Sequence, residues 1–149
     1  LYADRFVLSM DELERFVRAQ QHSYAQALDE IRAGRKRGHW IWFVFPQLKG
    51  LGYSDMSMFY GIADADEARH YLAHPLLGAR LREITAALLE TGMDDPIALM
   101  GRPDDLKLCS CMTLFEAVSH EPLFTQVLER FYHGKRDGRT LQMLGFNEK

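Results

Sequence analysis

The chain has 149 residues, of which 47% are hydrophobic and 26% are charged. This length and composition are typical of one globular domain and exclude a mainly disordered chain. The formal net charge of −3 argues against nucleic-acid binding through general positive charge, although it allows a local basic patch. We therefore expect a single globular domain over residues 1–149, with nucleic acid as a disfavoured partner.

The sequence predicts neither a membrane segment nor a secretion signal. The longest apolar run, Trp40–Pro46, is far shorter than the roughly 20 residues that span a bilayer. The first residues lack the basic and apolar regions of a signal peptide, so we expect a cytoplasmic protein without a membrane partner. Cys109 and Cys111 are too close on one element to bridge each other easily, which predicts two free thiols in a reducing compartment.

The first predicted helix runs from about residue 10 to residue 33. Ser9 and Glu12 form a capping box, which satisfies free backbone donors at a helix start. Gly34 follows the last helical position, where a glycine commonly ends a helix. The apolar residues between them recur at helical spacing, at Leu13, Phe16, Val17, Tyr24, Leu28 and Ile31.

The segment Trp40–Pro46 is rich in aromatic and β-branched residues, which suits a buried strand. A run this short fits a buried helical turn equally well. No other segment predicts a strand to pair with it, and an unpaired strand would leave backbone groups unsatisfied. We therefore favour a short helix ended by Pro46 and followed by a loop with Gly50 and Gly52, although the pattern alone leaves a strand open.

Prolines, capping residues and glycines place the remaining helices. Every proline except Pro46 lies near a predicted helix start, and glycines lie at several predicted ends. Helices are expected at residues 54–61, 64–73, 75–91, 95–101, 103–118, 122–133 and 139–144. Together these elements predict an all-α fold, a compact bundle of about seven or eight helices, several of them short, around the central aromatic segment.

The segment from residue 35 to residue 61 is the candidate functional region. Seven of the 17 aromatic residues lie between Trp40 and Tyr60, shortly after three consecutive basic residues. One interpretation is structural, with an aromatic core filler beside a solvated basic turn at a helix C-terminus. The other is a pocket for an anionic ligand, because Arg binds phosphate, bases stack on aromatic rings and glycine-rich loops offer backbone N–H groups. The candidate ligand-binding residues are Arg35, Lys36, Arg37, Trp40, Trp42, Gln47, Gly50, Gly52, Ser54 and Lys107.

His39 is the candidate catalytic residue, because it lies between the basic residues and the aromatic run and could act as a general acid or base. The alternative is a histidine that only hydrogen-bonds a backbone carbonyl. His70 and His74 are four residues apart, as in a metal-binding pair, but no third ligand has a suitable spacing. We therefore expect no bound metal, and no sequence motif indicates a cofactor.

Several stretches of the chain carry a family resemblance, and the most specific is the pattern H-W-x-W-F-x-F-P-Q-L at residues 39–48. The others are residues 13–20, 24–28, 31–37, 50–52, 60–62, 103–108 and 110–115. On these residues the chain resembles the bacterial domain-of-unknown-function 1810 family, which is sometimes labelled calpastatin. The resemblance implies a compact, mostly α-helical domain in bacteria and no established activity, cofactor or catalytic residue. The calpastatin label does not fit, because calpastatin proper is disordered and this composition is that of a folded domain.

Two functions remain open from the sequence. The first is binding, or hydrolysis, of a small anionic ligand that resembles a nucleotide or ADP-ribose, with basic residues next to the negative charge. The ADP-ribose part is an analogy with other small helical domains, and likeness of fold does not establish function. The alternative is a non-enzymatic protein-interaction module, which a structure with a broad apolar patch and no pocket would favour.

Overall fold

The computed structural model describes residues 12–146, and the regular elements in that range are ten α-helices with no strand. The all-α prediction is confirmed, with somewhat more helices than expected. The first helix covers residues 12–20. The others are α2 (Tyr24–Arg32), α3 (Ile41–Val44), α4 (Asp55–Phe59), α5 (Ala65–Ala73), α6 (Leu77–Glu90), α7 (Pro96–Met100), α8 (Asp104–Ser119), α9 (Pro122–Tyr132) and α10 (Gly138–Leu144).

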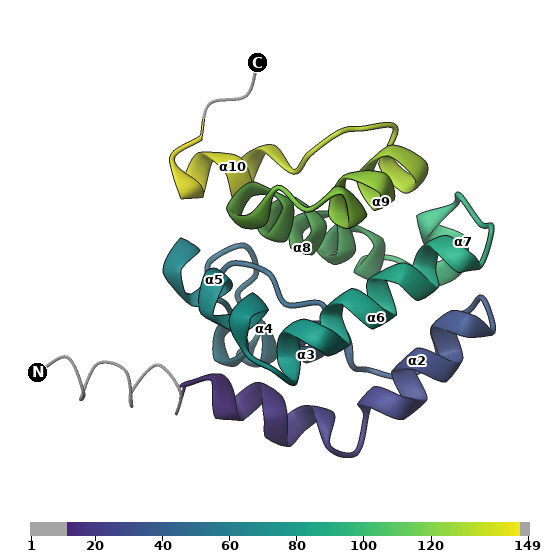
Figure 1. The fold of residues 1–149 in the computed structure, drawn as a ribbon, viewed down its shortest axis with the longest axis horizontal. Coiled ribbons are helices and arrows are strands. Elements are labelled where there is room, and N and C mark those ends of the chain that lie inside the picture. The colour runs from purple at the N-terminus through teal and green to yellow at the C-terminus, as the bar shows by residue number, and fades with distance from the viewer. Residues whose placement is uncertain (1–11, 147–149) are drawn as a thin grey trace, which may run out of the picture.

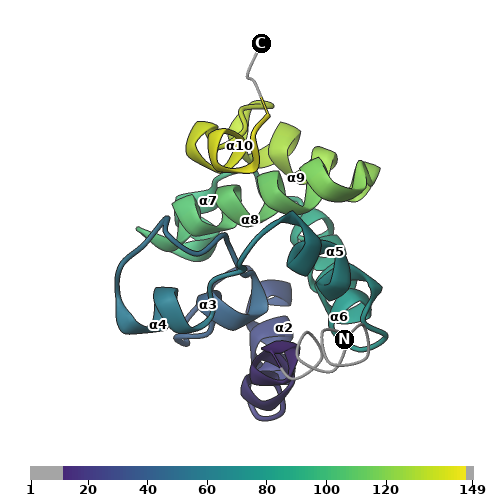
Figure 2. The same cartoon turned by 90° about the vertical axis from the view of Figure 1, so that its left-hand side faces the viewer.

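Helix α8 lies at the centre of the fold, where α5, α7, α9 and α10 pack against it and α3 touches it (Figure 1, Figure 2). All residues from Ser110 to Phe115 are buried, so every face of this part of the helix is covered. A helix that is covered all round is expected to be apolar all round. Its buried hydroxyl groups, on Ser110 and Thr113, donate to backbone carbonyls one turn earlier and so remain satisfied.

The predicted helix starts at Ser54, Asp64 and Asp95 are confirmed. The Ser54 hydroxyl accepts a hydrogen bond from the backbone N–H of Ser57, and the Asp64 carboxylate accepts one from that of Glu67. Asp95 caps α7 in the same way. Each side chain supplies an acceptor that the first turn of a helix cannot find within itself. These caps fix where α4, α5 and α7 begin.

The prediction of one helix from residue 10 to residue 33 is wrong, because the helix is interrupted at residues 21–23. Gln20 takes a buried position just before the break. Its side-chain amide donates to the Phe43 carbonyl oxygen at 2.7 Å and to the Tyr71 hydroxyl at 3.1 Å. A buried polar side chain therefore stands where the apolar pattern of the predicted helix would continue, and the helix ends there. Ser9 of the predicted capping box lies outside the described residues.

The aromatic segment forms α3, so the preference for a short helix over a strand is confirmed. Trp40, Phe43 and Phe45 are buried in the core, whereas Trp42 is only partly buried. The core-filling interpretation therefore holds for three of these side chains. Trp42 packs against the same core from a partly buried position.

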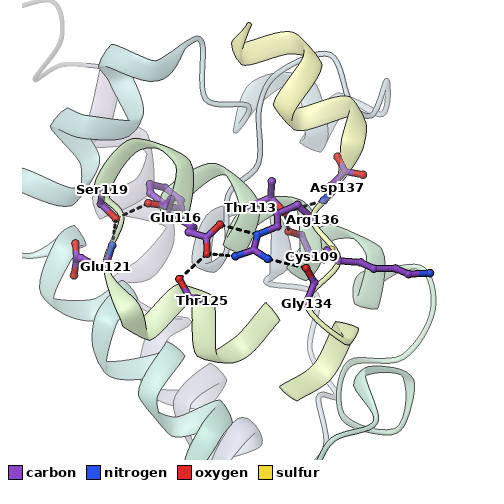
Figure 3. A network of polar contacts seen from close by, with 11 residues as sticks. Cys109, Thr113, Glu116, Ser119, Glu121, Thr125, Gly134, Arg136 and Asp137 are labelled. Carbon is purple, nitrogen blue, oxygen red and sulfur yellow. Dashed lines mark hydrogen bonds and ion pairs between the residues drawn. The ribbon is translucent and has the colours of Figure 1, made fainter. Parts of the chain in front are cut away.

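A network of polar contacts joins α8, α9 and the loop before α10 (Figure 3). The Glu116 carboxylate accepts two hydrogen bonds from Arg136, at 2.9 and 2.6 Å, and one from the Thr125 hydroxyl at 2.5 Å. Arg136 also donates to the Gly134 carbonyl at 2.7 Å. Burial on its own raises the pKa of a carboxyl group, but these hydrogen bonds outweigh it and hold the pKa of Glu116 below its usual range.

We expect Glu116→Ala to lower the free energy of unfolding by about 2 kcal/mol, because it leaves Arg136 and Thr125 without their shared acceptor. A carboxyl group whose pKa is lowered by folding stabilises the protein above its unfolded pKa and loses that effect as the pH falls. The difference between wild type and variant should therefore shrink as the pH drops through the acidic range. Urea denaturation of both proteins at several pH values measures this difference in the free energy of unfolding. Asp66→Ala, which removes an exposed ion pair with Arg69, is the control and should change stability by less than about 0.5 kcal/mol.

Candidate functional site

A small cavity lies among α3, the loop that follows it, α4 and the first turns of α8. The long loop from α3 to α4 arches away from the rest of the fold (Figure 2). The free volume of the cavity is about 10 Å³, which is room for roughly one water-sized group. Its walls are formed by Trp42, Phe45, Gln47, Ser57, Tyr60, Gly61 and Lys107.

Trp42, which lines this cavity, carries an unsatisfied hydrogen-bond donor. Among the residues that the structure describes, the buried side-chain atoms without a partner are Trp42 Nε1, Thr85 Oγ1 and Asp105 Oδ1. Of these residues only Trp42 lines the cavity. A buried donor without an acceptor costs about 1–3 kcal/mol, so this donor favours an oxygen atom as its partner in the cavity.

Lys107 brings a positive charge to the same cavity. Its ammonium group lies 3.6 Å from one oxygen of Asp104, a long ion pair. The other oxygen of Asp104 lies 2.6 Å from the ammonium group of Lys36, whose side chain is almost fully buried. One carboxylate is thus shared by two ammonium groups, which leaves a net positive charge beside the cavity. The closer pair belongs to Lys36, so Lys107 is the lysine that can bind a further anion.

Ser57 adds a hydroxyl group whose proton is available. The Ser54 hydroxyl donates to Ser57 Oγ at 3.0 Å, which leaves the Ser57 proton free to donate elsewhere. Gly52 permits the loop to pass over this hydroxyl, because a Cβ on Gly52 would lie 2.8 Å from Ser57 Oγ. The predicted residues Gly52 and Ser54 therefore shape the site through Ser57.

The cavity is closed on one side by a close approach of two backbone segments. Residues 47–49 and 61–62 form a single parallel bridge, with hydrogen bonds of 2.8 Å from Lys49 N to Ile62 O and 2.9 Å from Ile62 N to Gln47 O. A Cβ on Gly61 would lie 2.6 Å from the Cα of Lys49. Only glycine fits there, and it lets the bridge hold Gln47 in the cavity wall.

The basic turn does not reach the cavity wall. Arg35, Arg37 and His39 are exposed, and Trp40 is buried. Lys36 points inward, where its ammonium group lies 4.9 Å from the centre of the Trp40 ring. The sequence therefore alternates between exposed and buried side chains through this turn.

Glu30 holds the basic turn in place, and sequence reasoning missed it. One of its carboxylate oxygens accepts hydrogen bonds from Arg37 N at 2.7 Å, Gly38 N at 2.8 Å and Trp40 Nε1 at 2.9 Å. The other oxygen accepts one from Gln26 at 2.8 Å. Burial alone would raise the pKa of Glu30, but these hydrogen bonds outweigh it and lower the pKa to about 2. The Trp40 indole is thus satisfied, in contrast to that of Trp42.

Three of the predicted ligand-binding residues, Trp42, Gln47 and Lys107, lie together on the cavity wall. Gly50 lies farther along the loop, where a Cβ would lie 3.3 Å from the terminal methyl group of Met143. The lining residues that the sequence did not single out are Phe45, Ser57, Tyr60 and Gly61. Ser57 had one signal in the sequence, since it stands three residues after the capping residue Ser54, where its backbone N–H is expected to meet the cap.

The cysteines are free, as predicted, and neither is activated. Burial raises the pKa of the Cys109 thiol to about 11 and also raises the pKa of Cys111, so both stay protonated. Within residues 12–146, no group of three or more His, Cys, Asp or Glu side chains is arranged to hold a metal ion. In the same range, no helix combines the length and the apolar character needed to cross a membrane.

Fold and site together define an all-α domain with a buried central helix and a small, donor-lined cavity beside that helix. The chain belongs to the family described as "Protein of unknown function (DUF1810)", which matches residues 10–144. It is similar to the conserved hypothetical protein Rv1873 from Mycobacterium tuberculosis, whose crystal structure has 47% sequence identity and a TM-score of 0.88, covering 91% of this chain and 98% of that one. None of the curated proteins matches the chain. The resemblance to this family that the sequence indicated is confirmed.

Proposed function

We propose that this protein binds a small anionic ligand, one oxygen atom of which occupies the cavity beside Trp42 and Lys107. The observation that carries the proposal is the buried, unpartnered N–H of Trp42 in the wall of a cavity that also has a loosely paired ammonium group. Both groups donate hydrogen bonds and neither accepts them, so together they suit an anionic oxygen better than a neutral or cationic group.

The other polar groups of the cavity are compatible with the same ligand. Gln47, Ser57 and Tyr60 each carry a donor as well as an acceptor, and Phe45 adds an apolar wall. A few polar groups in a mostly apolar surround are typical of small-molecule sites. Nucleotides and ADP-ribose stay within the proposed ligand class, since a phosphate oxygen would meet the same donors. The free thiols favour the bacterial cytoplasm as the location.

We propose binding rather than hydrolysis. Among the described residues, the cavity wall contains no histidine, aspartate, glutamate or cysteine, so the Ser57 hydroxyl has no such group beside it in the wall to act as its base. His39, the candidate acid or base from the sequence, lies on the exposed basic turn instead. A hydrolytic role for His39 would need a ligand that extends from the cavity to that turn.

Thermal unfolding in the presence of phosphate-bearing and carboxylate-bearing compounds tests this proposal. A ligand at one hundred times its dissociation constant adds roughly 2.7 kcal/mol, which raises the midpoint of a domain this size by several degrees. We expect Lys107→Met and Trp42→Phe each to weaken binding about tenfold or more, because each removes one donor to a charged acceptor. Without ligand, Trp42→Phe should leave stability within about 1 kcal/mol of wild type, because it also removes an unsatisfied donor.

Lys135→Met is the matched control, because it removes the same charge from an exposed lysine that does not line the cavity. It should bind the ligand as wild type does. Equal affinity in wild type, Lys107→Met and Trp42→Phe would refute the proposed site. No saturable shift with any compound would refute the proposed function.

A protein-interaction module is the second candidate function, and one surface favours it. Helix α4 exposes Phe59, 60% accessible, and Met58, 39% accessible. Phe59 also lines an open groove of about 550 Å³ together with Arg15 and Arg18 of the first helix. A protein that co-purifies with this chain at fixed stoichiometry, and that no longer does so after Phe59→Ser, would support this function.

A further inference from the structure

Lys36 carries a buried ammonium group that does not line the cavity. Its side chain is only 6% exposed. The ammonium group pairs with Asp104 and donates to the Gly38 carbonyl oxygen, and it also lies over the Trp40 ring. The backbone N–H of Lys36 donates to the Leu99 carbonyl oxygen at 2.8 Å, which ties the basic turn to α7. Lys36 is thus held from several sides and is not free to turn toward a ligand in the cavity.

Asp104 connects Lys36 with the cavity lysine, Lys107. One oxygen of its carboxylate lies 2.6 Å from the Lys36 ammonium group, and the other lies 3.6 Å from that of Lys107. Asp104 and Lys107 are three residues apart in the first turns of α8, so their side chains lie on one side of the helix. Because the attraction between charges weakens with distance, Lys36 holds the carboxylate more strongly than Lys107 does. The pair between Lys36 and Asp104 therefore bears on how closely Asp104 approaches Lys107.

An anion in the cavity would compete with Asp104 for Lys107. Carboxylate and phosphate oxygens both accept hydrogen bonds from an ammonium group, and each offsets its positive charge. The side chains of Asp104 and Lys107 are 19% and 20% exposed, so water screens their attraction less than it screens that of a fully exposed pair. A closer contact between these two residues would therefore weaken the binding of an anion. Lys36 opposes that contact, because it holds the carboxylate by its other oxygen.

We infer that Lys36 is a positioning residue for anion binding, because it holds Asp104 away from Lys107 and so keeps the Lys107 charge available to the ligand. This inference rests on the proposed function, since it assigns two further residues to the same site. Asp104 acts in the opposite direction, because its carboxylate is a competitor that the protein itself supplies. The affinity for an anion should therefore follow the net charge of the three groups, which in wild type is one positive charge from two ammonium groups and one carboxylate.

Titration calorimetry with inorganic phosphate and with phenyl phosphate tests this inference, because the two probes present phosphate oxygens on ligands of different size. The three groups carry no net charge in Lys36→Met, two positive charges in Asp104→Asn and one again in the double variant Lys36→Met/Asp104→Asn. We expect Lys36→Met to weaken binding of both probes about fivefold or more, and Asp104→Asn to strengthen it by a similar factor. The double variant should regain the affinity that Lys36→Met loses. A purely structural role of Lys36 would not produce this recovery, because the double variant lacks the same buried contacts.

Lys135→Met is the control, because it changes the net charge of the protein as Lys36→Met does but removes an exposed lysine that does not line the cavity. It should bind both probes as wild type does. If Lys36→Met does not fold, Asp104→Asn should still bind more tightly than the double variant, because Lys36 adds its charge only in the former. Equal affinity of those two variants would overturn the inference.

The outcomes separate this inference from the proposed function. Wild-type affinity in Lys36→Met, or a double variant that binds as weakly as Lys36→Met, would overturn the inference and leave anion binding at the cavity intact. An Asp104→Asn variant that binds no more tightly than wild type would also overturn it. No binding of either probe to the wild-type protein would overturn both the inference and the proposed function.

Discussion

Replacing Gly78 with alanine is expected to lower the free energy of unfolding by about 3 kcal/mol or more. A Cβ on Gly78 would lie 2.1 Å from the backbone carbonyl oxygen of Leu72 and 2.9 Å from the guanidinium group of Arg82. That carbonyl belongs to the last turn of α5, and Arg82 donates to it at 3.1 Å. The alanine would therefore push α6 away from α5 and break the hydrogen bond that satisfies the end of α5.

The expected change in the free energy of unfolding has the opposite sign to the usual effect of replacing a helical glycine with alanine. Alanine within a helix is normally more stable than glycine by up to about 1 kcal/mol, so a loss of stability at Gly78 is expected from the close contacts with Leu72 and Arg82. Gly145→Ala is the control, because nothing lies within 4 Å of its Cβ position and its φ of 84° and ψ of 14° lie in the left-handed helical region. It should cost about 1–2 kcal/mol through backbone strain alone. Urea denaturation of both variants measures the difference, and a stabilised Gly78→Ala protein would contradict the packing described for α5 and α6.

Glu30→Ala is expected to cost about 3 kcal/mol, because it leaves two backbone N–H groups and the Trp40 indole without an acceptor at once. Glu30→Gln keeps the shape but loses the charge, and we expect it to cost about half as much. Trp40 is buried next to this network, so its fluorescence reports the loosened turn directly. An unchanged stability in Glu30→Ala would show that the turn does not depend on this carboxylate.

The effect of Glu30 on stability has a predicted pH dependence. Folding lowers the pKa of Glu30 from 4.5 to about 2, so the folded state binds its proton less readily than the unfolded state does. The stabilisation is therefore complete above about pH 5 and is lost progressively as the pH falls from there towards 2. The difference between wild type and Glu30→Gln should be constant from pH 5 to pH 7 and should shrink at lower pH.

The helices could be predicted from the sequence where a capping residue or a proline marks the start. Asp64, Asp95 and Pro122 each begin a helix where expected. The break at residues 21–23 could not be predicted, because beside it the buried Gln20 donates a hydrogen bond to Phe43 on another helix, a contact that no local pattern reveals. A polar side chain in an apolar stripe is as compatible with an exposed position as with a buried anchor. Only the packed structure distinguishes the two.

The candidate site was predicted in part. Lys107 is far from Trp42 and Gln47 in the sequence and meets them at the cavity, which agrees with a shared role but leaves that role to be tested. The sequence predicts Arg35, Lys36 and Arg37 as one group of ligand-binding residues, yet Lys36 points inward while its neighbours are exposed. Neighbours in a segment without helical structure face alternate directions, so a run of like residues does not form one surface.

Glu30 illustrates a contact that the sequence could not reveal. It lies in a helix, where an exposed glutamate is common, and its partners are a turn that begins several residues later. No residue pattern marks such a pairing, because the partners are backbone groups that every residue carries. The contacts of Glu30 also explain the contrast between the two tryptophans. Trp40 has Glu30 as its acceptor, whereas Trp42 lacks one in the described part of the chain.

This contrast provides the most direct test of the cavity as an anion site. The chain has two tryptophans, so its ¹⁵N-labelled form gives two indole N–H signals, which the spectrum of Trp42→Phe assigns. During titration with phenyl phosphate and with inorganic phosphate, we predict a saturable shift of the Trp42 signal while the Trp40 signal, already bound to Glu30, stays in place. A Trp42 signal that does not move, or two signals that move equally, would contradict binding of an anionic oxygen at this cavity.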